Sequence, residues 1–171
     1  RIAICMRIQS PVPSQNGGWV HKLKLGIEVP KPPEKKGMDR RDDVVLDRIY
    51  RKLITLLPLH PGHYQHLKDR GMTDEEIVRF GYRTLPATGR DKIVSYFDPK
   101  EVEGVPGFGI RRGQLTLAGS PGLIIPVMSP EKKIVSLVIR PDEQRPGRKY
   151  IVLSSAWLEK GASPGARLHL A

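Results

Sequence analysis

The sequence has 171 residues, of which 39% are hydrophobic, and its formal net charge is +11 at pH 7. This length predicts one domain of ordinary size with a small appendage. No apolar run approaches the ~18 residues of a membrane-spanning helix, and no signal peptide opens the chain. The single cysteine, Cys5, cannot form an internal disulfide, which predicts a cytoplasmic protein.

The positive charge favours an anionic partner, because a field of this sign raises the local concentration of polyanions. From residue 107 onward, ten Lys and Arg residues stand against four acids. The cations are Arg111, Arg112, Lys132, Lys133, Arg140, Arg145, Arg148, Lys149, Lys160 and Arg167, and the acids are Glu131, Asp142, Glu143 and Glu159. A solubilising surface is the alternative explanation. The cations fall at turns and strand ends, so we expect them to converge on one cationic rim beside a sheet and to bind a phosphate backbone.

The first 42 residues predict a small separate region. Residues 1–8 and 19–25 have strand patterns, and Asn16-Gly17 between them favours a tight hairpin turn. Residues 29–42 are rich in Pro and charge, which predicts a linker. We therefore place domain boundaries after residues 28 and 42.

Three short helices are predicted next. Apolar residues recur at helical spacing over residues 43–57, and Pro58 ends that pattern. A second helix is expected over residues 63–70. The third runs to Phe80 and begins with a capping box, in which Thr73 is the N-cap and Glu76 is its partner. Residues 82–90 are expected to be a loop, and residues 91–97 a further helix.

The last third of the chain predicts a sheet. Strand patterns cover residues 114–118, 123–128, 133–140 and 149–153, with a possible last strand at 167–170. Their connections are too short for crossover helices, which favours an antiparallel meander. The segment 104–113 before them is rich in glycine, and no strand is predicted there. The predicted fold class is α+β: a small β appendage and linker, a short helical lobe, then an antiparallel β-sheet with basic loops.

The order of these features resembles the RNA-polymerase-like core of bacterial-type DNA primases, which start DNA chains with short RNA. The residues that carry the resemblance are 67–80, 124–127, 138–140, 148–155, 159–161 and 167–170. The sequence is also similar to primase-related proteins of phages and mobile elements. Those proteins pair a Leu-Pro-Leu-x-x-x-His motif, here residues 57–63, with Gly-Tyr-Arg-x-Leu-Pro, here residues 81–86.

The resemblance implies a basic half-core that holds template and nucleotide phosphates beside a TOPRIM domain, whose acidic residues bind Mg or Mn. The chain departs from the family at Gly122-Leu123, where the family has Arg, and at Leu153-Ser154, where it has Asn-Ser. The 171 residues contain no TOPRIM glutamate or Asp-x-Asp motif. We therefore expect a fragment of a primase (a nucleotidyltransferase) with no cofactor of its own, inactive alone.

The N-terminus is similar to the trailing end of the zinc ribbon that precedes such cores. Cys5 would then be a zinc ligand in a longer parent protein. A structural zinc site needs four ligands, and the sequence contains no further cysteine. We expect no zinc bound by these residues alone.

The candidate phosphate-binding residues are Arg140, Arg148, Lys149, Lys160, Arg111 and Arg112. Each lies at a strand end or in a loop, where a charged side chain can reach a phosphate. A salt bridge with Asp142 or Glu143 is the alternative for Arg140. For Lys149 the alternative is a solvated cation beside an edge strand. Gly161 beside Lys160 would let a ligand approach the backbone.

Two other residue sets have structural explanations. His60, His63 and His66 look like a metal cluster, but Pro61-Gly62 disrupts their spacing and no Cys or carboxylate is suitably placed. Trp19 and Trp157 are candidates for stacking on bases, although a lone Trp is more often partly buried.

Three hypotheses follow from the sequence. The first is the template- and nucleotide-binding part of a primase-like replication protein, with single-stranded DNA and nucleoside triphosphates as partners and a replicative helicase as a further one. The second is a non-catalytic module that binds single-stranded nucleic acid. The third is a basic assembly domain that contacts only protein.

Overall fold

The computed structural model describes residues 2–5, 19–22, 38–144 and 149–165. Contacts divide the chain into two units, Arg1–Glu34 and Lys35–Ala171. In the first unit, β1 (Ile2–Cys5) pairs antiparallel with β2 (Trp19–Lys22), so both predicted strands are present in shortened form. No helix in the described part of the chain is long and apolar enough to cross a membrane.

The helical lobe of the second unit forms as its local sequence predicts. In α1 (Asp43–Leu56), the side chain of the N-cap Asp42 accepts hydrogen bonds from two backbone amides. The next helix, α2 (Pro61–Asp69), begins earlier than predicted, because Pro61 is tolerated in the first turn and His60 caps it. The capping box of Thr73 and Glu76 opens α3 (Asp74–Phe80) as predicted.

A four-stranded antiparallel sheet forms the centre of the second unit, with strand order β3-β6-β7-β8. Its strands are β3 (Arg83–Leu85), β6 (Gly122–Met128), β7 (Ile134–Pro141) and β8 (Ile151–Val152). The register pairs Ile124 with Ile139, and Ile139 in turn with Ile151. The predicted α+β class with an antiparallel sheet is therefore confirmed.

The structure corrects three details of the prediction. The expected loop at residues 82–90 contains β3, which pairs with β6, and α4 (Arg90–Val94) begins within it. The glycine-rich segment 104–113, in which no strand was predicted, contains β4 (Phe108–Arg111). This strand pairs with β5 (Gln114–Leu117) in a separate hairpin, so β5 does not belong to the meander. The possible strand at 167–170 lies outside the described residues.

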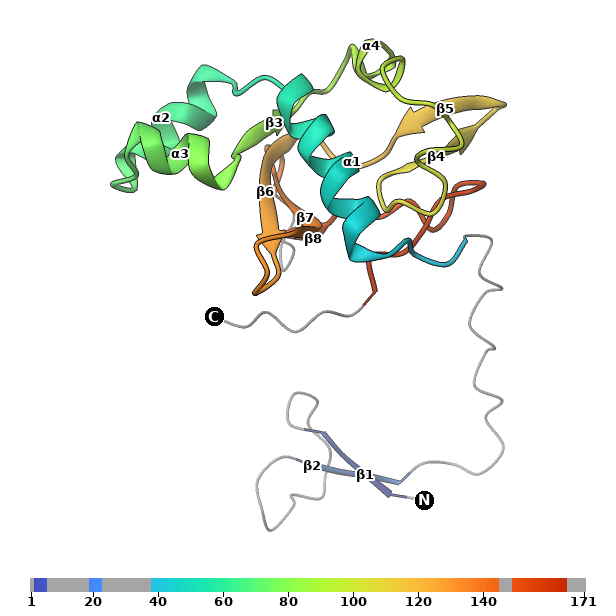
Figure 1. Ribbon diagram of the computed structural model, residues 1–171. Helices are drawn as coiled ribbons and strands as arrows, with labels where there is room; N and C mark the ends of the chain where they lie inside the picture. The colour runs from blue at the N-terminus through green and yellow to red at the C-terminus, as the bar shows by residue number, and fades with distance from the viewer. Residues whose placement is uncertain (1, 6–18, 23–37, 145–148, 166–171) are drawn as a thin grey trace. The chain divides into compact units, whose positions relative to one another are not determined.

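The main core lies between α1 and the sheet. Figure 1 shows α1 crossing the sheet, with α2 and α3 beside β3 and β6, and with the β4–β5 hairpin on the other side of α1. The largest fully buried side chains are Tyr50, Phe108, Leu46, Ile49, Leu53, Leu85, Ile124, Leu137, Ile139, Leu153, Val102 and Val105. The Tyr50 hydroxyl donates to the carbonyl of Pro106, at 2.9 Å. The sheet and the hairpin therefore share one core.

The residues just before α1 contact this core unit. Met38 forms a parallel bridge with Ala162, and the backbone amide of Arg41 donates to Gly104. Arg40 donates to the carbonyl of Val135 and pairs with Asp43. Residues 38–42, the last ones of the predicted linker, therefore belong to the second unit.

Candidate nucleic-acid interface

The β4–β5 hairpin presents two of the predicted cations at its tip. Arg111 pairs with Gln114 across the hairpin, which leaves Arg112 and Gly113 as a two-residue loop. Both loop residues have positive φ angles, 52° and 77°, as in the type I′ turns that suit the twist of hairpins. The side chains of Arg111 and Arg112 are exposed and form no hydrogen bond or ion pair with any residue that the structure describes.

A buried serine joins this hairpin to the segment that follows β8. The hydroxyl of Ser155, which is fully buried, donates to the carbonyl of Phe108 at 2.6 Å. It also accepts from the amides of Gly107 and Ala162. A Cβ at Gly109 would lie 2.6 Å from Leu158, so only glycine permits this close packing. Segment 153–162 is therefore held rigidly beside the hairpin.

This rigid segment places Trp157 beside the hairpin. Trp157 is 59% exposed, although Leu158 next to it is buried against the hairpin. An exposed indole on a rigid backbone is suited to stacking on a nucleobase, because little side-chain freedom is lost on binding.

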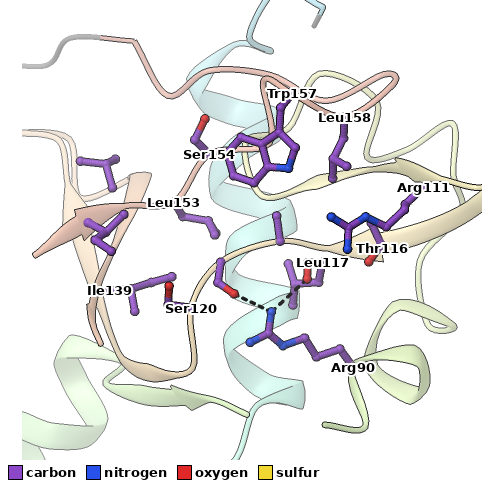
Figure 2. Close-up of a pocket in the computed structure, with 14 residues that line it drawn as sticks. Arg90, Arg111, Thr116, Leu117, Ser120, Ile139, Leu153, Ser154, Trp157 and Leu158 are labelled. Carbon is purple, nitrogen blue, oxygen red and sulfur yellow. Dashed lines mark hydrogen bonds between the residues drawn. The ribbon is translucent and has the colours of Figure 1, made fainter. Parts of the chain in front are cut away.

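A cavity of about 400 Å³ lies between Trp157 and the hairpin, and we call it the Trp157 pocket. It is lined by Arg90, Arg111, Thr116, Leu117, Ala118, Gly119, Ser120, Ile139, Ile151, Val152, Leu153, Ser154, Trp157 and Leu158. In Figure 2 the indole of Trp157 and the guanidinium of Arg90 lie on opposite sides of the pocket, and Arg111 extends from the hairpin toward it. Among these lining residues there are two arginines and no carboxylate.

Arg90 is held in place by backbone carbonyl groups. Its Nε donates to Pro86 at 2.6 Å, and its Nη1 donates to Leu117 and to Gly119. Burial lowers the pKa of its guanidinium, but arginine titrates so far above neutrality that it stays charged. No partner is described for Nη2 among the residues that the structure covers, so Arg90 keeps a donor for a ligand.

A second cleft of about 630 Å³ adjoins the Trp157 pocket and shares Arg90, Arg111, Thr116 and Leu117 with it. Arg112 and Asp91 also line this cleft. Three arginines therefore follow one surface from Trp157 to the hairpin tip. A positive groove next to an aromatic side chain is the usual arrangement for a single strand of nucleic acid.

A further candidate, Arg140, lines another pocket, and Lys149 lies beside one of the residues of that pocket. The Arg140 pocket, of about 280 Å³, is lined by His66, Leu67, Arg70, Met72, Tyr82, Leu123, Ile125, Arg140 and Tyr150. Nη1 of Arg140 lies 2.9 Å from Nε2 of His66, and its buried Nε has no described partner. Lys149 lies over the ring of Tyr150. Arg140 and Lys149 therefore flank the same exposed tyrosine.

Burial, followed by the positive charges of Arg140 and Arg70, lowers the pKa of His66. The neutral imidazole favoured by this shift can accept a hydrogen bond from Arg140 at Nε2. Arg140 is therefore oriented by His66, which lies in α2. No ion pair between Arg140 and Asp142 or Glu143 is found in the described part of the chain.

Lys160 has an acidic partner instead. Its ammonium pairs with Glu103, and this hydrogen bond and charge raise the pKa of Lys160. The adjacent Gly161 packs against protein rather than leaving room for a ligand, because a Cβ there would lie 2.0 Å from the carbonyl oxygen of Ser155. Among the described contacts, Lys160 shares no pocket with Arg140 or Arg111. Arg111, Arg140 and Lys160 therefore have different local surroundings, instead of the single cationic rim that was expected.

The remaining candidates lie outside what the structure describes. Arg148 falls in the segment 145–148, and the side chains of Cys5 and Trp19 belong to the first unit, for which only backbone pairing is described.

The three histidines have different hydrogen-bond partners, although the rings of His60 and His63 meet edge-on. His60 accepts from the amide of Gly62, and His66 contacts Arg140. His63 contacts the Thr84 hydroxyl through Nδ1 and Asp142 through Nε2, each at 2.8 Å. The contact with Thr84 brings the segment 57–63 against the segment 81–86. In the described residues, no group of three or more His, Cys, Asp or Glu side chains is placed to hold a metal ion.

Sequence reasoning missed Arg90 and Arg70. Arg90 lies within the segment expected to be a loop, and two of its three carbonyl partners, Leu117 and Gly119, are distant in the sequence. Arg70 ends the second predicted helix, where a cation is explained by the helix dipole alone. No local pattern distinguishes either residue from an ordinary surface arginine.

Comparison with known proteins relates this fold to primases. No family model and no curated protein matches the sequence. The RNA polymerase domain of Mycobacterium tuberculosis primase DnaG, in complex with double-stranded DNA with a 6-nucleotide overhang, is 17% identical with a TM-score of 0.53. The match covers 69% of this chain and 40% of that one. The DnaG primase catalytic domain bound to ssDNA has the same identity and a TM-score of 0.50, with 66% and 39% covered.

A further structure of the DnaG catalytic core has a TM-score of 0.50 and 17% identity, with 64% and 38% of the two chains covered. The chain thus shares the fold of DnaG catalytic cores and spans about 40% of the length of these structures.

Proposed function

We propose that this chain is the nucleic-acid-binding part of a DNA primase-like replication protein. In this proposal a single-stranded DNA template lies along the Trp157 pocket and the adjoining cleft. The observation that carries the proposal is the placement of one exposed indole and two arginines around a pocket without a carboxylate among its described lining residues. The fold shared with DnaG catalytic cores, two of them with bound DNA, supports the same reading.

The Arg140 pocket is the candidate site for nucleotide phosphates. Arg140 and Arg70 line it, and Lys149 lies beside its Tyr150. Guanidinium groups form paired, charge-assisted hydrogen bonds with phosphate oxygens. Lys160 would contribute only after separating from Glu103, and Arg148 would extend the basic surface next to Lys149.

Primer synthesis would require a longer protein. In the parent protein, a TOPRIM half would supply the carboxylates that bind Mg or Mn, and Cys5 would belong to a zinc ribbon. A replicative helicase would be a partner, and the parent would belong to a phage or a mobile element. The reading frame on both sides of these 171 residues tests this part of the proposal, which requires acidic TOPRIM motifs downstream.

Binding of single-stranded DNA to the full chain tests the proposal directly. We expect a fluorescently labelled 12-mer to bind at low salt and to lose affinity as salt rises, by about 0.7 in log–log slope for each phosphate contacted. A blunt duplex of the same length should bind more weakly, since its bases cannot reach the pocket. Absence of binding at low salt would favour the protein-only assembly domain.

The second hypothesis, a non-catalytic single-strand-binding module, predicts the same DNA binding without nucleotide binding. Direct binding of a fluorescent nucleoside triphosphate to the full chain separates the two. The primase proposal expects Arg140→Gln to weaken nucleoside triphosphate binding while leaving 12-mer binding largely unchanged.

A further inference from the structure

The shape of the Trp157 pocket suits a flat ligand with apolar faces. Its volume of about 400 Å³ lies at the lower end of the range for small-molecule sites, about 300–1,000 Å³. The indole of Trp157 forms one wall, and Leu117, Leu153 and Leu158 contribute apolar surface. A nucleobase has apolar faces and a polar edge, and unstacked bases are commonly held by an aromatic ring.

The polar groups of the pocket are mostly hydrogen-bond donors. Arg90 keeps Nη2, and Arg111 keeps its whole guanidinium, without partners among the described residues. The hydroxyls of Thr116 and Ser120 have no described partner either, and each can donate or accept. A ligand that presents two adjacent hydrogen-bond acceptors on one edge therefore fits the donors of the pocket best.

Bases differ in how many adjacent acceptors they present. Guanine offers O6 and N7 on one edge, the pair that arginine binds most often. Cytosine offers O2 and N3 side by side. Adenine and thymine alternate donors and acceptors along each edge, so two guanidinium groups satisfy them less well.

We propose that the Trp157 pocket takes up one unstacked base of the bound strand, with guanine or cytosine preferred over adenine or thymine. This inference rests on the proposed function, because the strand must bind before one of its bases enters the pocket. The backbone would continue along the cleft toward Arg112, and the base would lie between the indole and Arg90.

The test uses abasic 12-mers that carry a single base at the central position, so that only this base can enter the pocket. The protein is the full chain with Trp19→Phe, which leaves Trp157 as its sole tryptophan. We expect an oligomer with guanine or cytosine to quench Trp157 fluorescence. It should also bind roughly 5- to 150-fold more tightly than the fully abasic oligomer, as base–aromatic stacking implies.

Two variants test whether the gain in affinity from a single base depends on Trp157. Trp157→Ala should abolish the difference between one-base and abasic oligomers, measured by anisotropy. Tyr96→Ala, a similarly exposed aromatic outside the pocket, should preserve it. Equal affinity of the abasic and one-base oligomers would overturn the base pocket while leaving strand binding intact. Equal preference for all four bases would overturn the proposed selectivity, and failure of every oligomer to bind would overturn the proposed function as well.

Discussion

The hydroxyl of Ser155 donates a 2.6 Å hydrogen bond to the carbonyl of Phe108, 47 residues earlier in the chain. This contact joins the segment that carries Trp157 to the hairpin that carries Arg111. The buried Ser155 therefore helps to set the geometry of the candidate interface, together with the bridge between Ile110 and Glu159.

Ser155→Ala is expected to destabilise the protein by about 1–3 kcal/mol, because the amides of Gly107 and Ala162 lose their acceptor in the core. Chemical denaturation measures this change. Ser154→Ala is the matched control: its hydroxyl is half-buried and accepts only a long bond from Ala156. An equal effect of both substitutions would contradict the role of Ser155.

Arg90→Met should cost about 1.5–3 kcal/mol, because three carbonyl groups lose a charged donor. Arg112→Met removes an exposed arginine from the same surface and should change stability by less than about 0.5 kcal/mol. Thermal unfolding of both variants checks this difference. Equal stability of the two variants would show that the hydrogen bonds of Arg90 do not stabilise the wall of the Trp157 pocket.

The contact between His66 and Arg140 predicts a pH dependence. Since the pKa of His66 is lower in the folded protein, the unfolded chain binds more protons as the pH falls. The free energy of unfolding should therefore decrease as the pH drops below about 6.5, the ordinary value for histidine, and level off below the folded pKa. His66→Gln should flatten a series of melting temperatures between pH 5 and pH 8. A steeper dependence in this variant would contradict the assignment.

The pairing of Lys160 with Glu103 predicts opposite effects from two substitutions. Glu103→Gln should release the ammonium group and strengthen binding of single-stranded DNA, with a steeper salt dependence. Lys160→Ala should weaken that binding, because no ammonium is then available to leave Glu103 for a phosphate. Titrations at several salt concentrations distinguish them, and weaker binding by Glu103→Gln would exclude Lys160 from contact with phosphate.

Local signals account for what could be predicted from the sequence. The capping box at Thr73 and the apolar strand around Ile124 depend on neighbouring residues, and both appear as expected. By contrast, β4 was missed because Gly107 and Gly109 disfavour a strand. In the structure these glycines permit close packing against Leu153 and Leu158.

The arrangement of cations depended on distant contacts. Whether Lys160 points toward a phosphate or an acid is decided by Glu103, which lies 57 positions away. Arg90 is similarly placed by carbonyl groups from residues 117 and 119. Charge counts predicted a basic surface but carried no information about which cations share a pocket.

The most direct test of the interface is the salt dependence of single-strand binding for three variants. Arg111→Gln should reduce the log–log salt slope by about 0.7, because one phosphate contact is lost. Trp157→Ala should weaken binding at every salt concentration without changing the slope, because stacking releases no counterions. Arg79→Gln, a cation stacked on Phe80 in α3, should match the wild type. If Arg111→Gln and Trp157→Ala both bind as the wild type does, the nucleic acid does not lie along the Trp157 pocket.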